Sequence, residues 1–182
     1  TRTVRVVDTT SPAISVLGHL SVAHELGERY VDAHATATDA FDGALSVAVL
    51  SNDVDDSAVG SYAVTYVATD ASGNSATLTR TVQVVDTVAP VLSLLGPAEV
   101  FVEALSTYVD AGAVATDASW AGALAVASAD AVDTATLGEY TLRYEVADAS
   151  GNAAAPVTRT VRVVDTTSPA ISVLGHLSVA HE

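Results

Sequence analysis

Acidic and amide side chains stand at matching positions in the two halves of this 182-residue chain. They lie in short segments that also hold Gly, Ser or Pro, where side-chain oxygens of separate loops could converge. Ca²⁺ prefers such hard oxygen ligands and takes about six to eight of them. The pattern suggests Ca²⁺ sites at the junctions between repeated modules, formed by Asp8, Asp39, Asp42, Asp70 and Asn74 in the first half, and by Asp86, Asp117, Asp148 and Asn152 in the second.

The same residues have a second interpretation, as turn formers. Asp and Asn side chains bond nearby backbone amides and tolerate left-handed φ, so they are common in turns. The segment Asp70–Asn74 and its copy Asp148–Asn152 both fit a hairpin loop with Gly. In the second half Ala121 replaces Asp42, and a cation site there is expected to be weaker. Both interpretations remain open at the level of sequence.

An aromatic residue precedes the glycine of one acidic loop in each half, and these residues are Phe41 and Trp120. Exposed, such a ring could stack on a sugar or bind a partner protein. Buried, it would close the end of its domain or pack on a neighbouring one, because Phe and Trp bury large apolar surfaces. The sequence does not choose between these roles.

No pattern typical of an active site is present. His19, His24 and His34 align with other residue types in the second half, so they form no repeated site. No Ser lies in a nucleophile elbow, and no Gly-rich phosphate loop occurs. The absence of Cys and Lys excludes disulfides, thiolate metal sites and Schiff-base chemistry. We therefore expect a protein that is not an enzyme.

The matching positions reflect an internal repeat, which dominates the organisation of the chain. Residues 1–25 recur letter for letter as residues 158–182. Asp8, Asp86 and Asp165 open matching segments that each end in Pro, which favours short and stiff linkers. The predicted units are residues 1–7 as the last strand of a preceding module, 8–85 and 86–164 as two modules of about 78–79 residues, and 165–182 as a linker with the first strands of a following module.

Segments of alternating apolar residues, rich in Val, Thr and Tyr and bounded by Gly and Asp, predict β-strands. No segment combines a helical period with caps. About seven short strands in each module favour an all-β fold of tandem immunoglobulin-like β-sandwiches. In the first module the expected strands are Ala13–Leu17, Leu20–His24, Tyr30–Ala37, Ala44–Leu50, Ser61–Thr69 and Thr77–Val85, with a short one near Ser57.

Tyr62 and Tyr140 each follow a turn glycine at the start of the penultimate strand, and resemble the tyrosine corner of immunoglobulin-like sandwiches. Further shared motifs are the Asp-x-x-x-Pro opening, the Tyr-Val-Asp segment, the Asp-x-x-Gly-Asn hairpin and the Thr-Arg-Thr-Val exit. The whole chain thereby resembles the bacterial immunoglobulin-like repeats of cell-surface and pesticidal crystal proteins, which are related to hyalin-type repeats. The resemblance implies an extracellular, cell-surface location and a role as a spacer, stalk or adhesive arm.

Charge and hydropathy restrict the partners. A net charge of −15 disfavours nucleic acid and anionic membrane surfaces, and no apolar run is long enough to span a bilayer. The expected partners are neighbouring modules, like chains in a filament, or a surface glycan or protein, and the expected cofactor is Ca²⁺ alone. For a filament, Ala13–Leu17 or Thr77–Val85 would serve as open strand edges. The alternatives are a carbohydrate- or protein-binding module, or an accessory region of a secreted enzyme or toxin.

Overall fold

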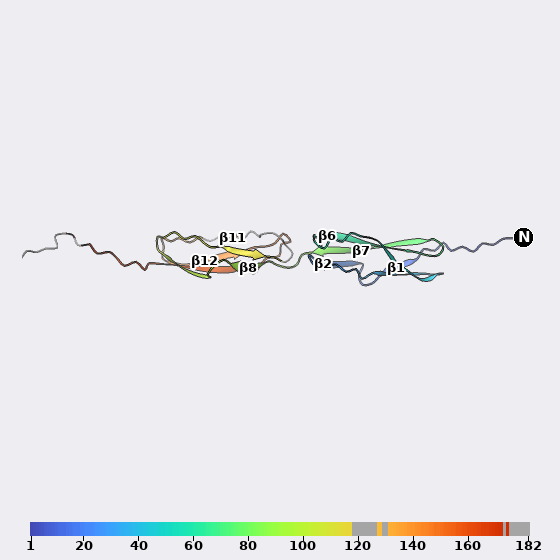
Figure 1. Cartoon of the computed structure of the whole chain (residues 1–182), viewed down its shortest axis with the longest axis horizontal. Helices are drawn as coiled ribbons and strands as arrows, with labels where there is room; N and C mark the ends of the chain where they lie inside the picture. The colour runs from blue at the N-terminus through green and yellow to red at the C-terminus, as the bar shows by residue number, and fades with distance from the viewer. Residues whose placement is uncertain (118–126, 129–130, 173, 175–182) are drawn as a thin grey trace, which may run out of the picture. The chain divides into compact units, whose positions relative to one another are not determined.

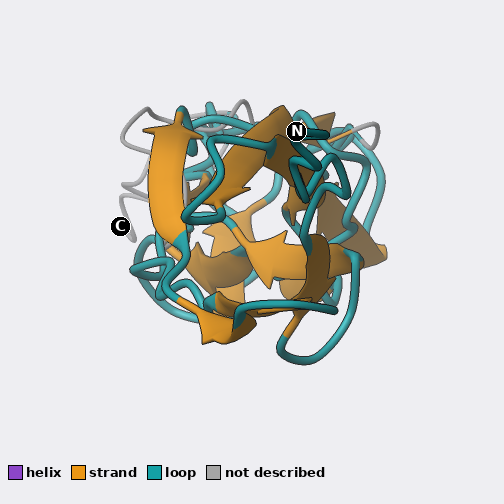
Figure 2. Cartoon of the chain, turned by 90° about the vertical axis from the view of Figure 1, so that its right-hand side faces the viewer, coloured by secondary structure: helices purple, strands orange, loops and turns teal. Residues whose placement is uncertain are grey.

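The computed structural model describes residues 1–117, 127–128, 131–172 and 174. The chain divides into two compact units. The first comprises Thr1–Ala89 with Asp117–Ala121 and Ala149–Asn152, and the second Pro90–Thr116, Gly122–Asp148 and Ala153–Glu182. Every regular element in the described part is a β-strand (Figure 2).

The first unit contains two sheets. Strands β1 (Ala13–Val16), β3 (Ala35–Asp39) and β4 (Gly43–Leu45) form one sheet, in the order β1-β3-β4. The other sheet has the order β2-β7-β6-β5, with β2 and β7 parallel (Figure 1). Its strands are β2 (Ser21–Glu25), β5 (Ala48–Asn52), β6 (Gly60–Thr69) and β7 (Ser75–Val85).

The core of this unit lies between its two sheets. Val64, Tyr66, Val82 and Val84 alternate with more exposed residues along β6 and β7 and are at most 1% exposed. Ile14, Val16 and Ala35 from the other sheet pack against them. The period-two pattern therefore gives each strand one buried face, as a β-sandwich requires.

The second unit repeats this arrangement. Strands β8 (Val91–Leu94) and β10 (Ala113–Thr116) pair, and a second sheet has the order β11-β12-β13-β9, with β13 and β9 parallel. The strands of the second sheet are β9 (Glu99–Glu103), β11 (Ala127–Ser128), β12 (Gly138–Glu145) and β13 (Val157–Val164). Leu92, Leu142, Tyr144 and Val161 belong to its core.

A tyrosine corner is present in both units. The Tyr62 hydroxyl donates a hydrogen bond to the carbonyl of Ala58 (2.9 Å), and that of Tyr140 donates to Thr136 (3.0 Å). A Cβ on Gly60 would lie 3.2 Å from the Tyr62 ring, which is closer than ordinary van der Waals contact, so glycine favours the close approach of ring and backbone there. These bonds confirm the tyrosine-corner prediction, and the two sheets confirm the all-β, immunoglobulin-like fold.

Several predicted strand limits were wrong. In the segment predicted as Tyr30–Ala37, only Ala35–Ala37 lies in a strand, because His34 adopts a left-handed φ of 67°. The predicted strand Ala44–Leu50 is split between β4 and β5. Ser57 lies in a turn, where Asp55 accepts hydrogen bonds from its amide (3.0 Å) and hydroxyl (2.6 Å).

The strand edges also differ from expectation. Within Thr77–Val85, residues Thr81–Val85 are no open edge, since they lie between β2 and β6 and pair with both. Thr77–Arg80 pair with β6 and not with β2, so only the second half of the expected edge is closed by strand pairing on both sides. By contrast, β1 does lie at the edge of its sheet. Residues 1–12 form no strand in this structure, and the module limits stay predictions.

Candidate cation site and buried arginine networks

Four carboxylates of the first unit converge at one point. One oxygen each from Asp8, Asp39, Asp42 and Asp70 lies within 4.8 Å of all the others. Asp8 belongs to the segment that leads into β1, Asp39 is the last residue of β3, Asp42 lies in the turn that follows, and Asp70 belongs to the loop after β6. The structure thus brings together four residues that the sequence analysis proposed as ligands. In the described part of the chain, no other group of acidic or histidine side chains meets so closely.

One oxygen of each turn carboxylate caps backbone amides. Asp39 Oδ1 accepts hydrogen bonds from the amides of Phe41 (2.7 Å) and Asp42 (3.1 Å). Asp42 Oδ2 accepts one from the amide of Ala71 (2.9 Å), which connects the β3–β4 turn to the β6–β7 hairpin. Asp8 Oδ1 accepts one from Thr10 (2.9 Å). The turn-forming interpretation therefore accounts for these oxygens.

Asn74 joins the cluster as a hydrogen-bond donor. Its amide nitrogen Nδ2 donates to Asp70 Oδ2 (2.7 Å) and to the carbonyl of Asp8 (3.4 Å). Burial raises the pKa of Asp70, but hydrogen bonds from the side chain and backbone of Asn74 outweigh that effect and hold the pKa below its usual value. Asp70 is thus an ionised carboxylate at neutral pH.

Two carboxylate oxygens of these four residues lack such bonds. Asp39 is 8% exposed, and its Oδ2 is buried with no hydrogen-bond partner among the described residues. The same holds for Oδ2 of Asp8. Within the described residues, none of the four carboxylates forms an ion pair with Arg or His.

The predicted Ca²⁺ ligands of the second repeat are described in the structure, but the position equivalent to Asp42 is not. Asp86 accepts hydrogen bonds from the amide of Val88 (3.2 Å), from the hydroxyl of Ser150 (3.3 Å) and, through its carbonyl, from Asn152 Nδ2 (3.1 Å). The last bond repeats the one between Asn74 and Asp8. Asp148 is 9% exposed and Asp117 half-buried. Ala121, which replaces Asp42, lies outside the described residues.

The two aromatic candidates are placed unequally. The ring of Phe41 is 79% exposed, so it does not close the end of its own sandwich. Trp120 lies outside the described residues. The exposed ring of Phe41 is therefore accessible to a binding partner.

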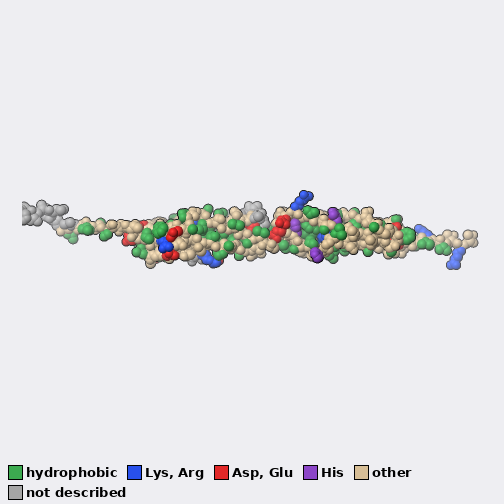
Figure 3. Space-filling view, turned by 90° about the horizontal axis from the view of Figure 1, so that it is seen from below, with side chains coloured by type: hydrophobic (Ala, Val, Ile, Leu, Met, Phe, Trp, Pro, Cys, Tyr) green, Lys and Arg blue, Asp and Glu red, His purple; other side chains and the backbone are tan. Residues whose placement is uncertain are grey.

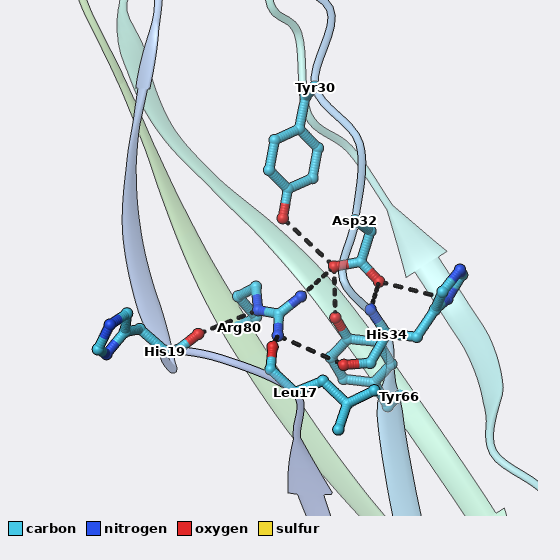
Figure 4. A network of polar contacts seen from close by, with 7 residues as sticks. All are labelled: Leu17, His19, Tyr30, Asp32, His34, Tyr66 and Arg80. Atoms are coloured by element: carbon cyan, nitrogen blue, oxygen red, sulfur yellow. Dashed lines mark hydrogen bonds and ion pairs between the residues drawn. The ribbon is translucent and has the colours of Figure 1, made fainter.

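A second polar network, which the sequence analysis did not predict, lies inside the first sandwich (Figure 4). Arg80 on β7 is 1% exposed, and its Nη1 pairs with Asp32. Its Nε donates to the carbonyl of His19 (3.1 Å), and its Nη2 donates to the carbonyls of Leu17 and His34. The guanidinium thereby ties three loop carbonyls to the centre of the sheet.

Asp32 is equally well satisfied. It accepts hydrogen bonds from the hydroxyls of Tyr66 (2.6 Å) and Tyr30 (3.3 Å) and from the amide of His34 (2.9 Å). Burial raises its pKa, but these bonds and the charge of Arg80 hold the pKa below its usual value. Burial and the carboxylate in turn raise the pKa of Tyr66.

The second unit holds the same network. Arg159, 1% exposed, pairs with Asp110 and donates to the carbonyl of Pro97 (2.9 Å). Asp110 also accepts from Tyr144 and Tyr108. Burial raises the pKa of Asp110, but hydrogen bonds from Tyr144, Tyr108 and Arg159 outweigh it and lower the pKa to about 2. Since both charges are paired, these groups serve the fold and leave no reactive side chain.

A glutamate holds the segment that leaves each sandwich. Glu25, at the end of β2, accepts hydrogen bonds from the amide and the hydroxyl of Thr87 (both 2.8 Å). Glu103, at the end of β9, accepts the same pair from Thr166 (2.9 and 2.7 Å) and a third from Thr167 (2.8 Å). We call this arrangement the linker clamp, since it fixes the backbone just beyond the last strand.

Two sandwiches with tyrosine corners and equivalent buried networks define a tandem immunoglobulin-like protein. A family model described as "Bacterial surface protein, Ig-like domain" matches residues 14–84 and 92–163. The chain belongs to this family of immunoglobulin-like surface repeats.

The chain is also similar to two curated proteins named hyalin. It is 33% identical to that of Strongylocentrotus purpuratus over 93% of the chain and 15% of the relative, and 35% identical to that of Lytechinus variegatus over 92% and 34%. The chain therefore spans about a third or less of these relatives. Among solved structures, fibronectin(III)-like modules of Clostridium thermocellum CbhA align with 93% of this chain and 100% of theirs, at 19% identity and a TM-score of 0.37. In the described residues, no helix is long and apolar enough to cross a membrane.

Proposed function

We propose that the chain is a non-enzymatic, extracellular repeat segment that serves as a spacer in a surface stalk, adhesin arm or structural filament. The family assignment and the hyalin relatives support a surface location. The observation that carries the spacer role is the linker clamp, which recurs with the same residue types in both units.

The clamp restrains bending at the point where a spacer is weakest. A linker of ordinary composition samples many backbone conformations. Thr87 donates two hydrogen bonds to one carboxylate, which fix both its amide and its side chain, and Pro90, three residues later, has a fixed φ. Together these features leave few freely rotating residues between the last strand and the next sandwich.

The clamp can be tested by ¹⁵N relaxation of the full chain. In Glu25→Ala we expect the order parameter of the Thr87 amide to fall from a value typical of rigid backbone to below about 0.6. Glu28→Ala removes an acid of the same turn whose side chain forms no hydrogen bond with the linker among the described residues, and should leave Thr87 rigid. An equally rigid Thr87 in both variants would contradict the role of the clamp.

A binding module is the second candidate, and the exposure of Phe41 favours it. A glycan array probed with the full chain separates the two functions. For a spacer we expect no glycan above background. Binding that disappears in Phe41→Ala, while the fold is retained, would show a carbohydrate-binding module and overturn the proposal of a passive spacer.

A further inference from the structure

We propose that Asp8, Asp39, Asp42 and Asp70 bind one Ca²⁺ ion in the first unit. The proposal concerns this chain alone and does not depend on the spacer role. Its basis is the convergence of four carboxylates from three separate segments onto a common point.

Turn formation leaves part of the cluster unexplained. Asp39 uses Oδ1 to cap the turn, yet its Oδ2 is buried without a hydrogen-bond partner in the described residues, and the side chain is more than nine-tenths buried. A buried carboxylate oxygen without a partner is costly, because it has lost water and gained nothing in return. Asp8 Oδ2 repeats the situation from the leading segment. A cation among these oxygens would satisfy both.

The charge of the site points to the same ligand. Four carboxylates this close repel one another, and in the described part of the chain no Arg or His pairs with any of them. A divalent cation bound among these oxygens would supply the counter-charge that the described side chains do not.

The spacing and the loop origin of the ligands favour Ca²⁺ over Mg²⁺. Ca²⁺–oxygen distances of about 2.3–2.6 Å allow opposite ligands to lie roughly 4.6–5.2 Å apart. The four oxygens, all within 4.8 Å of one another, fit inside such a coordination sphere. Ca²⁺ also accepts irregular geometry and added waters, whereas Mg²⁺ demands a near-ideal octahedron. Ligands from three independent segments suit the more permissive ion.

Binding would have a mechanical consequence. Asp8 is held to the sandwich by the weak 3.4 Å bond from Asn74 to its carbonyl, and residues 1–12 form no strand. An ion shared by Asp8, Asp42 and Asp70 would tie this leading segment to both loops. The segment would then be held more firmly at its end near the sandwich when Ca²⁺ is present.

Calorimetric titration of CaCl₂ into the metal-free full chain tests the proposal. Asp42→Ala gives the first repeat the residue that the second has at this position, and Asp8→Asn alters a residue outside every strand, so it tests the site without risk to the fold. The control is Asp55→Ala, which also removes one turn-capping carboxylate but lies outside the cluster.

We expect Ca²⁺ binding by the unaltered chain, at least tenfold weaker binding in Asp42→Ala and Asp8→Asn, and unchanged binding in Asp55→Ala. Saturating Ca²⁺ should also raise the Tm of the first repeat by about 5 °C or more in the unaltered chain. No binding, or equal binding by all variants, would overturn the proposal. Equal affinity for Mg²⁺ would overturn the assignment to Ca²⁺.

Discussion

The two repeats agree in their interiors and differ in their loops. Arg80 with Asp32 in the first, and Arg159 with Asp110 in the second, form the same network with two tyrosines. By contrast, the loop that holds Asp42 in the first repeat has Ala121 in the second. The comparison separates what each sandwich needs in order to fold from what one loop has gained or lost.

A second difference concerns backbone strain. Among the residues that the structure describes, each repeat has one non-glycine residue with left-handed φ, at a position where the other repeat has glycine. The first has His34 at φ 67° where the second has Gly112 at 78°. The second has Leu105 at φ 61° where the first has Gly27 at 78°. In each case one repeat uses the residue that tolerates left-handed backbone, and the other forces a side-chain residue into it.

The largest effect is expected from breaking the buried pair. Asp32→Ala leaves Arg80 buried without a counter-charge and should reduce the free energy of unfolding of the first repeat by about 3–5 kcal/mol. Asp110→Ala should cost the second repeat less, because the Asp110 side chain is 25% exposed and that of Asp32 only 9%. Amide hydrogen exchange in β7 and β13 reports each repeat separately.

Glu145→Ala is the control for this pair of variants. This substitution breaks the ion pair between Arg143 and Glu145, whose side chains are 51% and 59% exposed. It should reduce the free energy of unfolding by less than about 1 kcal/mol. Equal losses in Asp32→Ala and Glu145→Ala would show that burial does not set the strength of these pairs.

Acid should weaken both repeats through the same carboxylates. The pKa of Asp110 is lowered to about 2 in the folded state, and that of Asp32 is also lowered. The contribution of these carboxylates to the free energy of unfolding is complete above the unfolded-state pKa of about 4 and is lost as the pH falls toward 2. For Asp110 the loss should reach about 2 kcal/mol. Asp110→Asn should flatten this dependence for β13 in hydrogen exchange; an unchanged pH profile would contradict the assignment.

Relief of backbone strain should give a smaller, stabilising effect. Leu105→Gly in the second repeat and His34→Gly in the first should each raise the free energy of unfolding by about 0.5–1 kcal/mol. The reverse changes, Gly27→Leu and Gly112→His, should destabilise by a similar amount through the backbone alone, since a Cβ at either glycine meets no atom within 4 Å. Thermal unfolding of the four variants would reveal the opposite signs, and equal signs would refute the explanation.

Local features of the sequence were predicted well. The strands Ser61–Thr69 and Thr77–Val85 follow from alternating apolar residues, and the bond of Tyr62 from its position after Gly60. The acidic cluster could be predicted from the sequence because an immunoglobulin-like topology brings several loops together at one end of the sandwich. These inferences need only short segments or a known fold.

Pairings over long distances were not predicted. Asp32 and Arg80 lie 48 residues apart, and nothing local marks them as partners. The segment before β3 was mistaken for a strand because Tyr30 and Val31 favour β-structure, whereas Asp32 in fact bonds the amide of His34 and ends the extended run. One available signal was the recurrence of Tyr-Val-Asp together with a strand arginine in both repeats.

The central claim, that the acidic loops of the first repeat bind Ca²⁺, is tested most directly by ¹H–¹⁵N spectra of the full chain with one equivalent of CaCl₂. We predict that the amide signals of Asp8, Asp39 and Asp70 shift together, while those of β12 and β13 in the second repeat stay in place. Spectra that do not change, or that change without these three signals, would contradict the claim.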